Sequence, residues 1–558
     1  MTRFKKIGCL LLSLAMLAST ACSKSSGSSS SSAGISSAQV SSEEDSRFNN
    51  GGVSPICKEK VSLTICMAEN ANVEDYATNF QTQMLKEYGN YDLSFVTYPS
   101  ADFNDKISVM VAAGGEELAD VIIKYFSDPM VYSFAQQGAL IPLTEYYNDP
   151  DIAYYLTEAV DRTGVDYKPM ITSPDGEIYY IPSYNQSLLN EYPAKIWIYQ
   201  PWLDTLNLEA PTDADSLYNV LKAFVANDLN GNGKADEIGL AACKEKTYDY
   251  WIEGLMNMFV YAGGTNYYTV DDGNFGFAFL QDGWLEGLTY INKLYSEGLI
   301  TPLIFTQDDA QYKAMLGQED TIVGMAINMA MGALPAGDAR RSEYVGIAPL
   351  KGKDGTQVTT YVPSAPNCQF VITKNCADPE AAFRLGDLLT SEELSIHTRW
   401  GEKGVDWVEP SAGDTSMFAD LGYDAVIKET GTLTWGTVQN KHWTQIGPYI
   451  RQYSIALGMV WDGSTNSTDY MVSRIQGEYT GKGPEEVIPK LILNDEESEE
   501  TSEILATLNT YVSESIGGFV TGALNLTADW EAFKNECKTI GVDTIIEVYQ
   551  GVYDRMYK

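Results

Sequence analysis

The sequence is poor in basic charge. Its 558 residues include 37 Lys and Arg against 76 Asp and Glu, which gives a formal net charge of −39. A surface of this sign repels phosphate backbones and anionic lipids. The composition therefore argues against nucleic-acid binding and against peripheral attachment to a membrane, so any membrane attachment is expected to be covalent.

Histidine is nearly absent as well. His397 and His442 are the only two, and neither has a His or Cys neighbour at metal-ligand spacing. A Ser-His-Asp triad or a histidine-rich zinc site needs imidazoles that converge with partner residues. We expect both histidines to be structural.

Long apolar runs are missing from the body of the chain. A membrane-spanning helix needs about 20 consecutive apolar residues, and no segment after residue 21 has them. The phosphate loop G-x-x-x-x-G-K-[ST] is also missing. The chain is therefore expected to be neither a transport pore nor an ATPase.

The first 21 residues have the pattern of a secretory signal. Arg3, Lys5 and Lys6 precede an apolar run over residues 7–18, and small residues lead to Ala21 and Cys22. The junction resembles a bacterial lipobox, which implies lipidation of Cys22 and a place on the outer face of the cell membrane. Ser19 stands where that pattern usually has Leu, so cleavage by ordinary signal peptidase, which would release a soluble chain, remains the alternative.

A polar segment follows the signal. Residues 23–54 are rich in Ser and Gly, and such a composition has too little apolar surface to fold on its own. We interpret residues 22–57 as a tether. Six cysteines remain after Cys22, and their spacing matches no metal motif, so export leaves disulfides and buried free thiols equally open.

Strand and helix patterns alternate from residue 58 onwards. Strands are predicted at residues 61–65, 93–96 and 119–123, with helices at residues 73–88 and 102–113 between them. This alternation predicts an α/β fold with a mainly parallel sheet.

Several segments of this body resemble family 1 extracellular solute-binding proteins. They are DFNDKISVMVAAGGEELADVII (102–123), GEIYYIPSYN (176–185), IWIYQPWLDTLNLEAPTDADSLYNVLKAF (196–224) and the C-terminal helices of residues 511–556. The resemblance implies two α/β lobes joined by hinge strands, with a ligand cleft between them. By this analogy lobe one takes residues 58–165 and 325–365, and lobe two takes residues 166–324 and 366–558.

The resemblance also implies a function. Such a protein is the binding component of an ABC importer; it captures a sugar or oligosaccharide by cleft closure, delivers it to a membrane permease and is not an enzyme. Two alternatives are a surface glycan-acting hydrolase, which needs only a pair of carboxylates, and a structural or adhesive lipoprotein, which would be expected to show repeats.

Residues 228–237 form the most specific local motif. Oxygen-bearing side chains stand at alternate positions, as in the first part of an EF-hand calcium loop, and Gly233 permits the sharp turn. Gly239 occupies the twelfth position, where an EF-hand has Glu. A short calcium loop of this kind occurs in some members of the family, which implies a structural ion held by Asp228, Asn230, Asn232, the Lys234 carbonyl, Asp236 and Glu237. A solvated Asn/Gly/Asp turn is the alternative.

Sugar recognition requires flat aromatic surfaces beside fixed polar groups. Trp and Gly cluster in residues 400–447, and the family places such segments near its cleft. The candidate ligand-binding residues are Tyr184, Asn185, Trp251, Trp400, Trp407 and Trp435. Packing in an ordinary core is the alternative for each of them.

Overall fold

The computed structural model describes residues 47–558 except 244–248, 265, 336, 434–435 and 489. The predicted signal and Cys22 lie outside the described residues. The tether is shorter than predicted, because Arg47 already forms an ion pair with Asp378 and Phe48 pairs with Cys57 in an isolated β-bridge. Phe48 is buried in the first core, and its burial explains why the fold begins ahead of residue 58.

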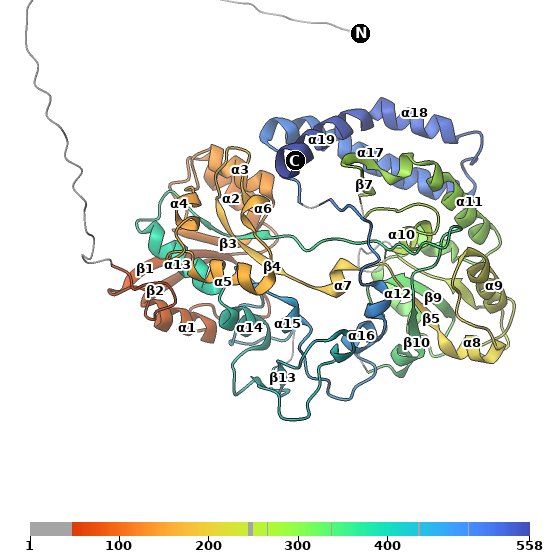
Figure 1. Cartoon of the computed structure of the whole chain (residues 1–558), viewed down its shortest axis with the longest axis horizontal. Coiled ribbons are helices and arrows are strands. Elements are labelled where there is room, and N and C mark those ends of the chain that lie inside the picture. The colour runs from red at the N-terminus through yellow and green to blue at the C-terminus, as the bar shows by residue number, and fades with distance from the viewer. Residues whose placement is uncertain (1–46, 244–248, 265, 336, 434–435, 489) are drawn as a thin grey trace, which may run out of the picture. The chain divides into compact units, whose positions relative to one another are not determined.

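The first sheet has six strands. In spatial order they are β14 (Ile450–Arg451), β4 (Tyr180–Asn185), β11 (Asn367–Ile372), β3 (Val121–Phe126), β1 (Val61–Ala68) and β2 (Tyr91–Tyr98). Figure 1 labels β1, β2, β3 and β4 of this sheet. β1 pairs in parallel with β2 and β3, and the connecting helices are α1 (Phe80–Gly89) and α2 (Phe103–Ala112). The predicted alternation of strands and helices is confirmed here. α1 begins later than predicted because the Asn79 side chain caps it by accepting from Gln81 N.

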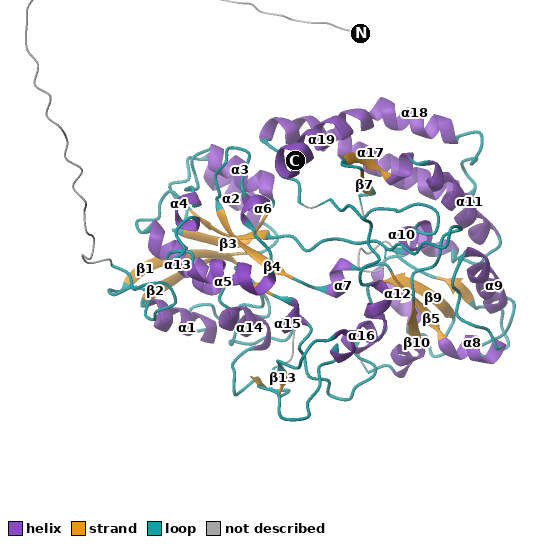
Figure 2. Ribbon diagram, viewed as in Figure 1, coloured by secondary structure: helices purple, strands orange, loops and turns teal. Residues whose placement is uncertain are grey.

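Six further helices belong to this lobe. They are α3 (Asp128–Gln136), α4 (Thr144–Tyr147), α5 (Tyr154–Thr163), α6 (Lys168–Ile171), α13 (Pro379–Leu389) and α14 (Glu392–Trp400). Figure 2 shows helices around the strands of this sheet. β11 runs antiparallel to both of its neighbours, β3 and β4, so the sheet is mixed. β11 follows a long connection from β10 (Tyr344–Ile347), which lies in the other sheet. Within the described residues no crossover helix of the first sheet directly precedes it, so β11 can run in either direction.

The second sheet has four strands. In order they are β10 (Tyr344–Ile347), β5 (Lys195–Tyr199), β9 (Val323–Asn328) and β6 (Ile238–Leu240). Its helices are α8 (Gln200–Leu206), α9 (Ala214–Val225), α10 (Trp251–Met256), α11 (Asp282–Ser296), α12 (Asp309–Leu316), α16 (Thr468–Tyr479), α17 (Asp495–Thr521), α18 (Trp530–Ile540) and α19 (Val542–Tyr557). β7 (Tyr268–Asp271) and β8 (Asn274–Phe277) form a separate hairpin.

The buried apolar side chains form two large, separate cores, one for each sheet with its helices. We call these units lobe one and lobe two. The predicted lobe boundaries are wrong for five strands. β4, β11 and β14 belong to the sheet of lobe one, and β9 and β10 pair with β5 in lobe two. All six residues of β9 are buried, and a buried strand carries no local signal for which sheet it joins.

The chain passes between the sheets three times. The first passage follows β4 and contains α7 (Leu188–Glu191), the second joins β10 to β11, and the third follows β14 and contains α15 (Tyr453–Ala456). A small third core lies beside the last passage and contains Ile396, Trp400, Trp407, Ile427 and Ile455. No helix within the described part of the chain is long and apolar enough to cross a membrane.

The six cysteines of the described residues are buried and form no disulfide. Burial raises the thiol pKa to about 11 for Cys57 and Cys376 and to about 12 for Cys66 and Cys537. Thiols of this kind are protonated and unreactive at neutral pH. Of the two possibilities that the sequence left open, the structure contains buried thiols.

Candidate ligand-binding site

A small cavity lies where the passages between the lobes meet. Lobe one contributes Asn185 at the end of β4, Arg451 at the end of β14 and Trp400 at the end of α14, and lobe two contributes Asp469 and Val472 from α16. The cavity has a volume of about 170 Å³. Since small-molecule pockets usually enclose ~300–1,000 Å³, this volume corresponds to one subsite of a larger ligand.

Three polar atoms of this cavity's lining are buried without a hydrogen-bond partner among the described residues. They are Asn185 Oδ1, Trp400 Nε1 and Arg451 Nε. A buried polar group without a partner costs about 1–3 kcal/mol, and buried polar atoms in native proteins are normally satisfied. All three residues line the same cavity, which makes it a candidate site for a polar ligand.

Arg451 is the most deeply buried cation of the cavity, with 6% of its surface exposed. Its guanidinium carbon lies 4.9 Å from the ring centre of Trp400 and 5.0 Å from that of Tyr449. Nη2 donates to Gln445 Oε1. Burial lowers the pKa of Arg451 to about 10, so the group stays charged at neutral pH.

These contacts offset part of the cost of burying the charge. A cation over an aromatic ring gains about 0.5–2 kcal/mol, and removing an ion from water costs several kcal/mol even after relaxation. None of the carboxylates in the described part of the chain forms an ion pair with Arg451. Arg451 is therefore under-compensated.

Arg399, the second arginine of the cavity, has a different environment. It is half-buried, and burial lowers its pKa while the carboxylates of Glu429 and Asp469 oppose the effect. Burial in turn raises the pKa of both carboxyl groups, and Arg399 offsets part of that rise. These three groups compensate one another.

The predicted ligand-binding residues lie in different parts of the structure. Trp400 and Asn185 line the cavity. Tyr184 is 5% exposed and packs on Tyr167 with ring centres 5.1 Å apart, so it supports β4 from the core side. Trp251 is 2% exposed in the core of lobe two, where it packs edge-on against Phe305. Trp435 lies outside the described residues.

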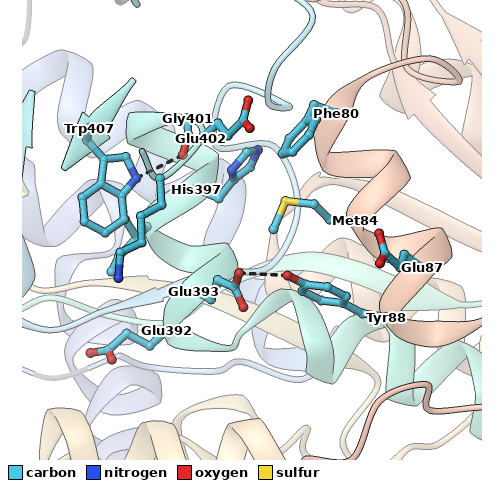
Figure 3. Close-up of a pocket in the computed structure, with 12 residues that line it drawn as sticks. Phe80, Met84, Glu87, Tyr88, Glu392, Glu393, His397, Gly401, Glu402 and Trp407 are labelled. Atoms are coloured by element: carbon cyan, nitrogen blue, oxygen red, sulfur yellow. Dashed lines mark hydrogen bonds between the residues drawn. The ribbon is translucent and has the colours of Figure 1, made fainter. Parts of the chain in front are cut away.

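Trp407 lines a second, larger cavity of about 540 Å³ (Figure 3). Figure 3 shows side chains from α1, such as Met84 and Tyr88, facing side chains from α14, such as Glu393 and His397. The Trp407 indole donates to Gly401 O at 3.2 Å, and the Tyr88 hydroxyl donates to Glu393 at 3.0 Å.

This larger cavity is built mainly from elements of lobe one. Its helices α1 and α14 both belong to that lobe, and four of its lining residues are Glu87, Glu392, Glu393 and Glu402. A ligand held there has no contact with α16, so it cannot bring the two lobes together. The smaller cavity, which both lobes line, is therefore the candidate ligand site.

Arg399, Arg451 and Asp469 were not predicted from the sequence. Arg399 directly precedes Trp400, so the Trp-Gly clustering lay next to it. Arg451 belongs to a strand of two residues, which is too short to leave a periodic signal. The three residues come from separate segments, and only the folded chain brings them to one cavity.

Residues 228–237 connect α9 to β6 and fold back on themselves. The Asp236 carboxylate accepts from the Asn230 amide at 3.0 Å and from the Asn232 amide at 3.2 Å. Hydrogen bonds from these amides lower the pKa of Asp236. Glu237 Oε1 accepts from Leu229 N at 2.7 Å, and Asp228 Oδ2 accepts from Gly233 N at 3.0 Å.

The donor set of this loop suits a hard cation. Carboxylate and amide oxygens are the ligands that calcium prefers, and the loop holds five such side chains, namely Asp228, Asn230, Asn232, Asp236 and Glu237. Gly233, with φ +79°, makes the turn that gathers them. No group of three or more His, Cys, Asp or Glu side chains within the described residues is arranged to hold a metal ion; the amide oxygens of two asparagines are needed to complete this set.

Comparison with known proteins identifies the family. The family described as bacterial extracellular solute-binding protein matches residues 70–394, more than half of the chain. This protein therefore belongs to the bacterial extracellular solute-binding proteins, a class whose two-lobed fold agrees with the two cores described above.

Two curated relatives extend over most of the chain. The fructooligosaccharide ABC transporter substrate-binding protein FusA of Streptococcus pneumoniae is 23% identical over 518 residues, covering 90% of this chain and 92% of that protein. The polygalacturonan/rhamnogalacturonan-binding protein YtcQ of Bacillus subtilis is 22% identical over 402 residues, covering 70% and 74%.

Solved structures share the fold. An HMO-binding, ABC-transporter-associated solute-binding protein from Bifidobacterium longum infantis superposes with a TM-score of 0.72 at 19% identity, over 89% of this chain and 99% of that one. An EF-hand mutant of S. pneumoniae FusA in complex with fructo-nystose superposes with a TM-score of 0.68 at 22% identity, over 88% and 99%.

Proposed function

We propose that this protein captures an oligosaccharide outside the cell and delivers it to the membrane permease of an ABC importer. The observation that carries the proposal is the cavity lined by both lobes, in which Asn185 Oδ1, Trp400 Nε1 and Arg451 Nε are buried without partners. The relatives named for oligosaccharide or polysaccharide binding support the class of ligand.

The lining of the cavity suits a sugar. A sugar ring presents apolar C–H faces and a rim of hydroxyl groups. Asn185 Oδ1 accepts from one hydroxyl, and Trp400 Nε1 donates to another. Trp407 packs with Trp400 in the third core, so it holds the indole in place from behind without contacting ligand.

Ligand-driven closure follows from the two-lobed lining. A ligand in this cavity contacts Asn185 and Trp400 of lobe one and α16 of lobe two. Such a ligand binds more tightly when both sets of contacts are made, and that difference in affinity shifts the population toward the closed form. The permease then recognises the closed form. In this scheme the protein binds and releases its ligand without chemical change.

We further propose that residues 228–237 hold a structural calcium ion. Asp228, Asn230, Asn232, Asp236 and Glu237 would supply side-chain oxygens, and Lys234 its backbone carbonyl. The support is the donor set and the way its hydrogen bonds already close the loop. The ion would fix the connection between α9 and β6, at the edge of the second sheet.

Export and anchoring complete the proposal. The signal-like residues 1–21 and Cys22 support secretion followed by acylation at Cys22, and the polar segment after it is long enough to carry the folded lobes away from the bilayer. The lipid anchor would keep the protein on the outer face of the cell membrane, close to its permease.

Isothermal titration calorimetry tests the proposed function. The chain from Ser23 onwards is titrated with neutral and acidic oligosaccharides, and the same samples are analysed for products. Saturable one-to-one binding with intact sugar is expected. Cleaved sugar would instead promote the hydrolase alternative, and no binding across the panel would overturn the assignment to oligosaccharides.

A further inference from the structure

We propose that the oligosaccharide bound in this cavity carries a carboxylate, as a uronic acid unit does, and that this carboxylate pairs with Arg451. The inference rests on the proposed function and deepens it, because it specifies the chemical class of the ligand. The relatives do not decide this point, since their names include a fructooligosaccharide and a polygalacturonan.

Arg451 is fixed before any ligand arrives. Its backbone carbonyl accepts from Gln186 N at 3.0 Å, which holds β14 beside the end of β4. Its side chain lies against the rings of Trp400 and Tyr449, and Nη2 donates to Gln445. The edge of the guanidinium that carries Nε is left without an acceptor. A side chain held this firmly is pre-organised for a planar anion.

Arg451 differs from two other arginines in having no carboxylate partner among the described residues. Arg384, also buried, forms ion pairs with Glu380 and Asp151, and Arg399 in the same cavity faces Glu429 and Asp469. The chain has 76 acidic residues, yet none of those in the described part pairs with Arg451. A negative charge on the ligand would then supply the counter-ion for Arg451.

The chemistry around Arg451 selects a sugar carboxylate over a simple anion. Arginine binds a carboxylate through two parallel N–H···O bonds, one of them from Nε in the side-on geometry. Asn185 and Trp400 line the same cavity, and their Oδ1 and Nε1 atoms have no partner among the described residues. A hydroxyl group can donate to the first and accept from the second. An inorganic anion would satisfy Arg451 alone, whereas a uronate unit carries the carboxylate and the hydroxyl groups on one ring.

Matched pairs of ligands test the inference with the unaltered protein. Oligouronates of two to four units from pectin, alginate and glycosaminoglycan are each compared by calorimetry with the same oligosaccharide after reduction of its carboxyl groups to alcohols. At least one oligouronate is expected to bind at least 100-fold more tightly than its reduced partner. Its affinity is also expected to fall as salt rises, because part of the attraction is ionic.

Two variants locate the effect at Arg451. Arg451→Gln is expected to weaken oligouronate binding at least 100-fold and to reduce the preference for the oligouronate over its reduced partner to less than threefold. Arg451→Lys keeps the positive charge but lacks the planar guanidinium. Its affinity for the oligouronate is expected to lie between those of the unaltered protein and Arg451→Gln. Arg474→Gln removes an exposed arginine that pairs with Asp420 and is expected to change neither affinity.

The outcomes separate this inference from the proposed function. If an oligosaccharide binds and its reduced form binds equally well, the carboxylate inference is wrong and the importer function stands. If neither form of any sugar binds, the proposed function itself fails. If Arg451→Gln does not fold, the comparison of ligand pairs on the unaltered protein still decides the question.

Discussion

The carboxylate of Glu191 accepts a hydrogen bond of 2.6 Å from the hydroxyl of Ser364, a residue 173 positions away in the sequence. Glu191 lies in the first passage between the lobes and Ser364 in the second. The other carboxylate oxygen accepts from the hydroxyl of Tyr453, at the start of the third passage. One buried side chain, 2% exposed, thus ties together all three segments on which any movement of the lobes depends.

Replacing Glu191 is expected to destabilise the protein strongly. Glu191→Ala leaves the hydroxyls of Ser364 and Tyr453 without an acceptor, and it removes the carboxylate that raises the pKa of buried Lys195 against the lowering effect of burial. We expect a loss of about 2–4 kcal/mol in the free energy of unfolding, measured by urea denaturation. Glu503→Ala, on the exposed face of α17, is the matched control and should change stability by less than about 0.5 kcal/mol.

Double-mutant cycles show whether the three segments are coupled through Glu191. The effects of Glu191→Ala and Tyr453→Phe should not add, because both remove the same hydrogen bond. Simple additivity would show that the hydrogen bond contributes little and that the passages are held by packing alone.

The Trp400 indole is expected to contribute directly to ligand affinity. Trp400→Phe keeps an aromatic face but removes Nε1, which has no partner among the described residues. Loss of one hydrogen bond to ligand should weaken oligosaccharide binding about 10-fold, equivalent to about 1.4 kcal/mol. Calorimetry with a ligand found in the panel measures the change.

Trp461→Phe is the matched control for this experiment. Trp461 is 39% exposed, and its indole already donates to Ser464 O, so its removal should leave ligand affinity within twofold. Equal affinities for the Trp400→Phe variant and the unaltered protein would remove Trp400 from the site.

Local patterns were the part of this structure that the sequence predicted well. The helix predicted at residues 102–113 agrees with α2, and the strand predicted at residues 61–65 agrees with the start of β1. The other early strands were likewise predicted within a few residues, whereas α1 begins at Phe80 and not at residue 73. In each case the signal lies within one element and depends on neighbours in sequence.

The assignment of strands to lobes could not be predicted in the same way. β4 and β9 are both almost entirely buried, and their sheets are chosen by partners more than a hundred residues away. The residues that line the cavity were hard to predict for the same reason. Trp400 was found through its Trp-Gly setting, whereas Arg451 matters because of what surrounds it after folding, and nothing next to it in the sequence shows that it lacks a counter-ion.

Calcium is expected to stabilise the protein through residues 228–237. At a concentration 100-fold above the dissociation constant, a ligand that binds only the folded state adds about 2.7 kcal/mol. Treatment with a chelator should therefore lower the melting temperature by several degrees, and added calcium should restore it. Calorimetric scans with and without calcium measure both effects.

Asp236→Asn should abolish this response, because it removes the carboxylate on which the amides of Asn230 and Asn232 converge. Asp161→Asn, on an exposed face of α5, is the control and should leave the response intact. A melting temperature that ignores calcium in the unaltered protein would show that the loop is a hydrogen-bonded turn without an ion.

His442 is expected to make stability fall in mild acid. Its ring is 2% exposed and accepts at Nδ1 from Thr444 N at 2.9 Å. Burial, with further contributions from nearby His397 and Arg399, lowers its pKa to about 4. Between pH 6.5 and pH 4 the unfolded chain therefore binds a proton that the folded chain refuses, so the free energy of unfolding must fall as pH falls through this range.

The size of this effect follows from the shift in pKa. One unit corresponds to about 1.4 kcal/mol, so lowering the pH from 7.5 to 5 should remove about 2 kcal/mol of stability through His442 alone. His442→Asn retains an acceptor for Thr444 N but cannot titrate. Urea denaturation at pH 7.5 and pH 5 should therefore show a smaller loss for this variant than for the unaltered protein, by about that amount. Equal losses in the two proteins would show that the His442 ring already takes up its proton in the folded state, and that the hydrogen bond from Thr444 N does not hold it neutral.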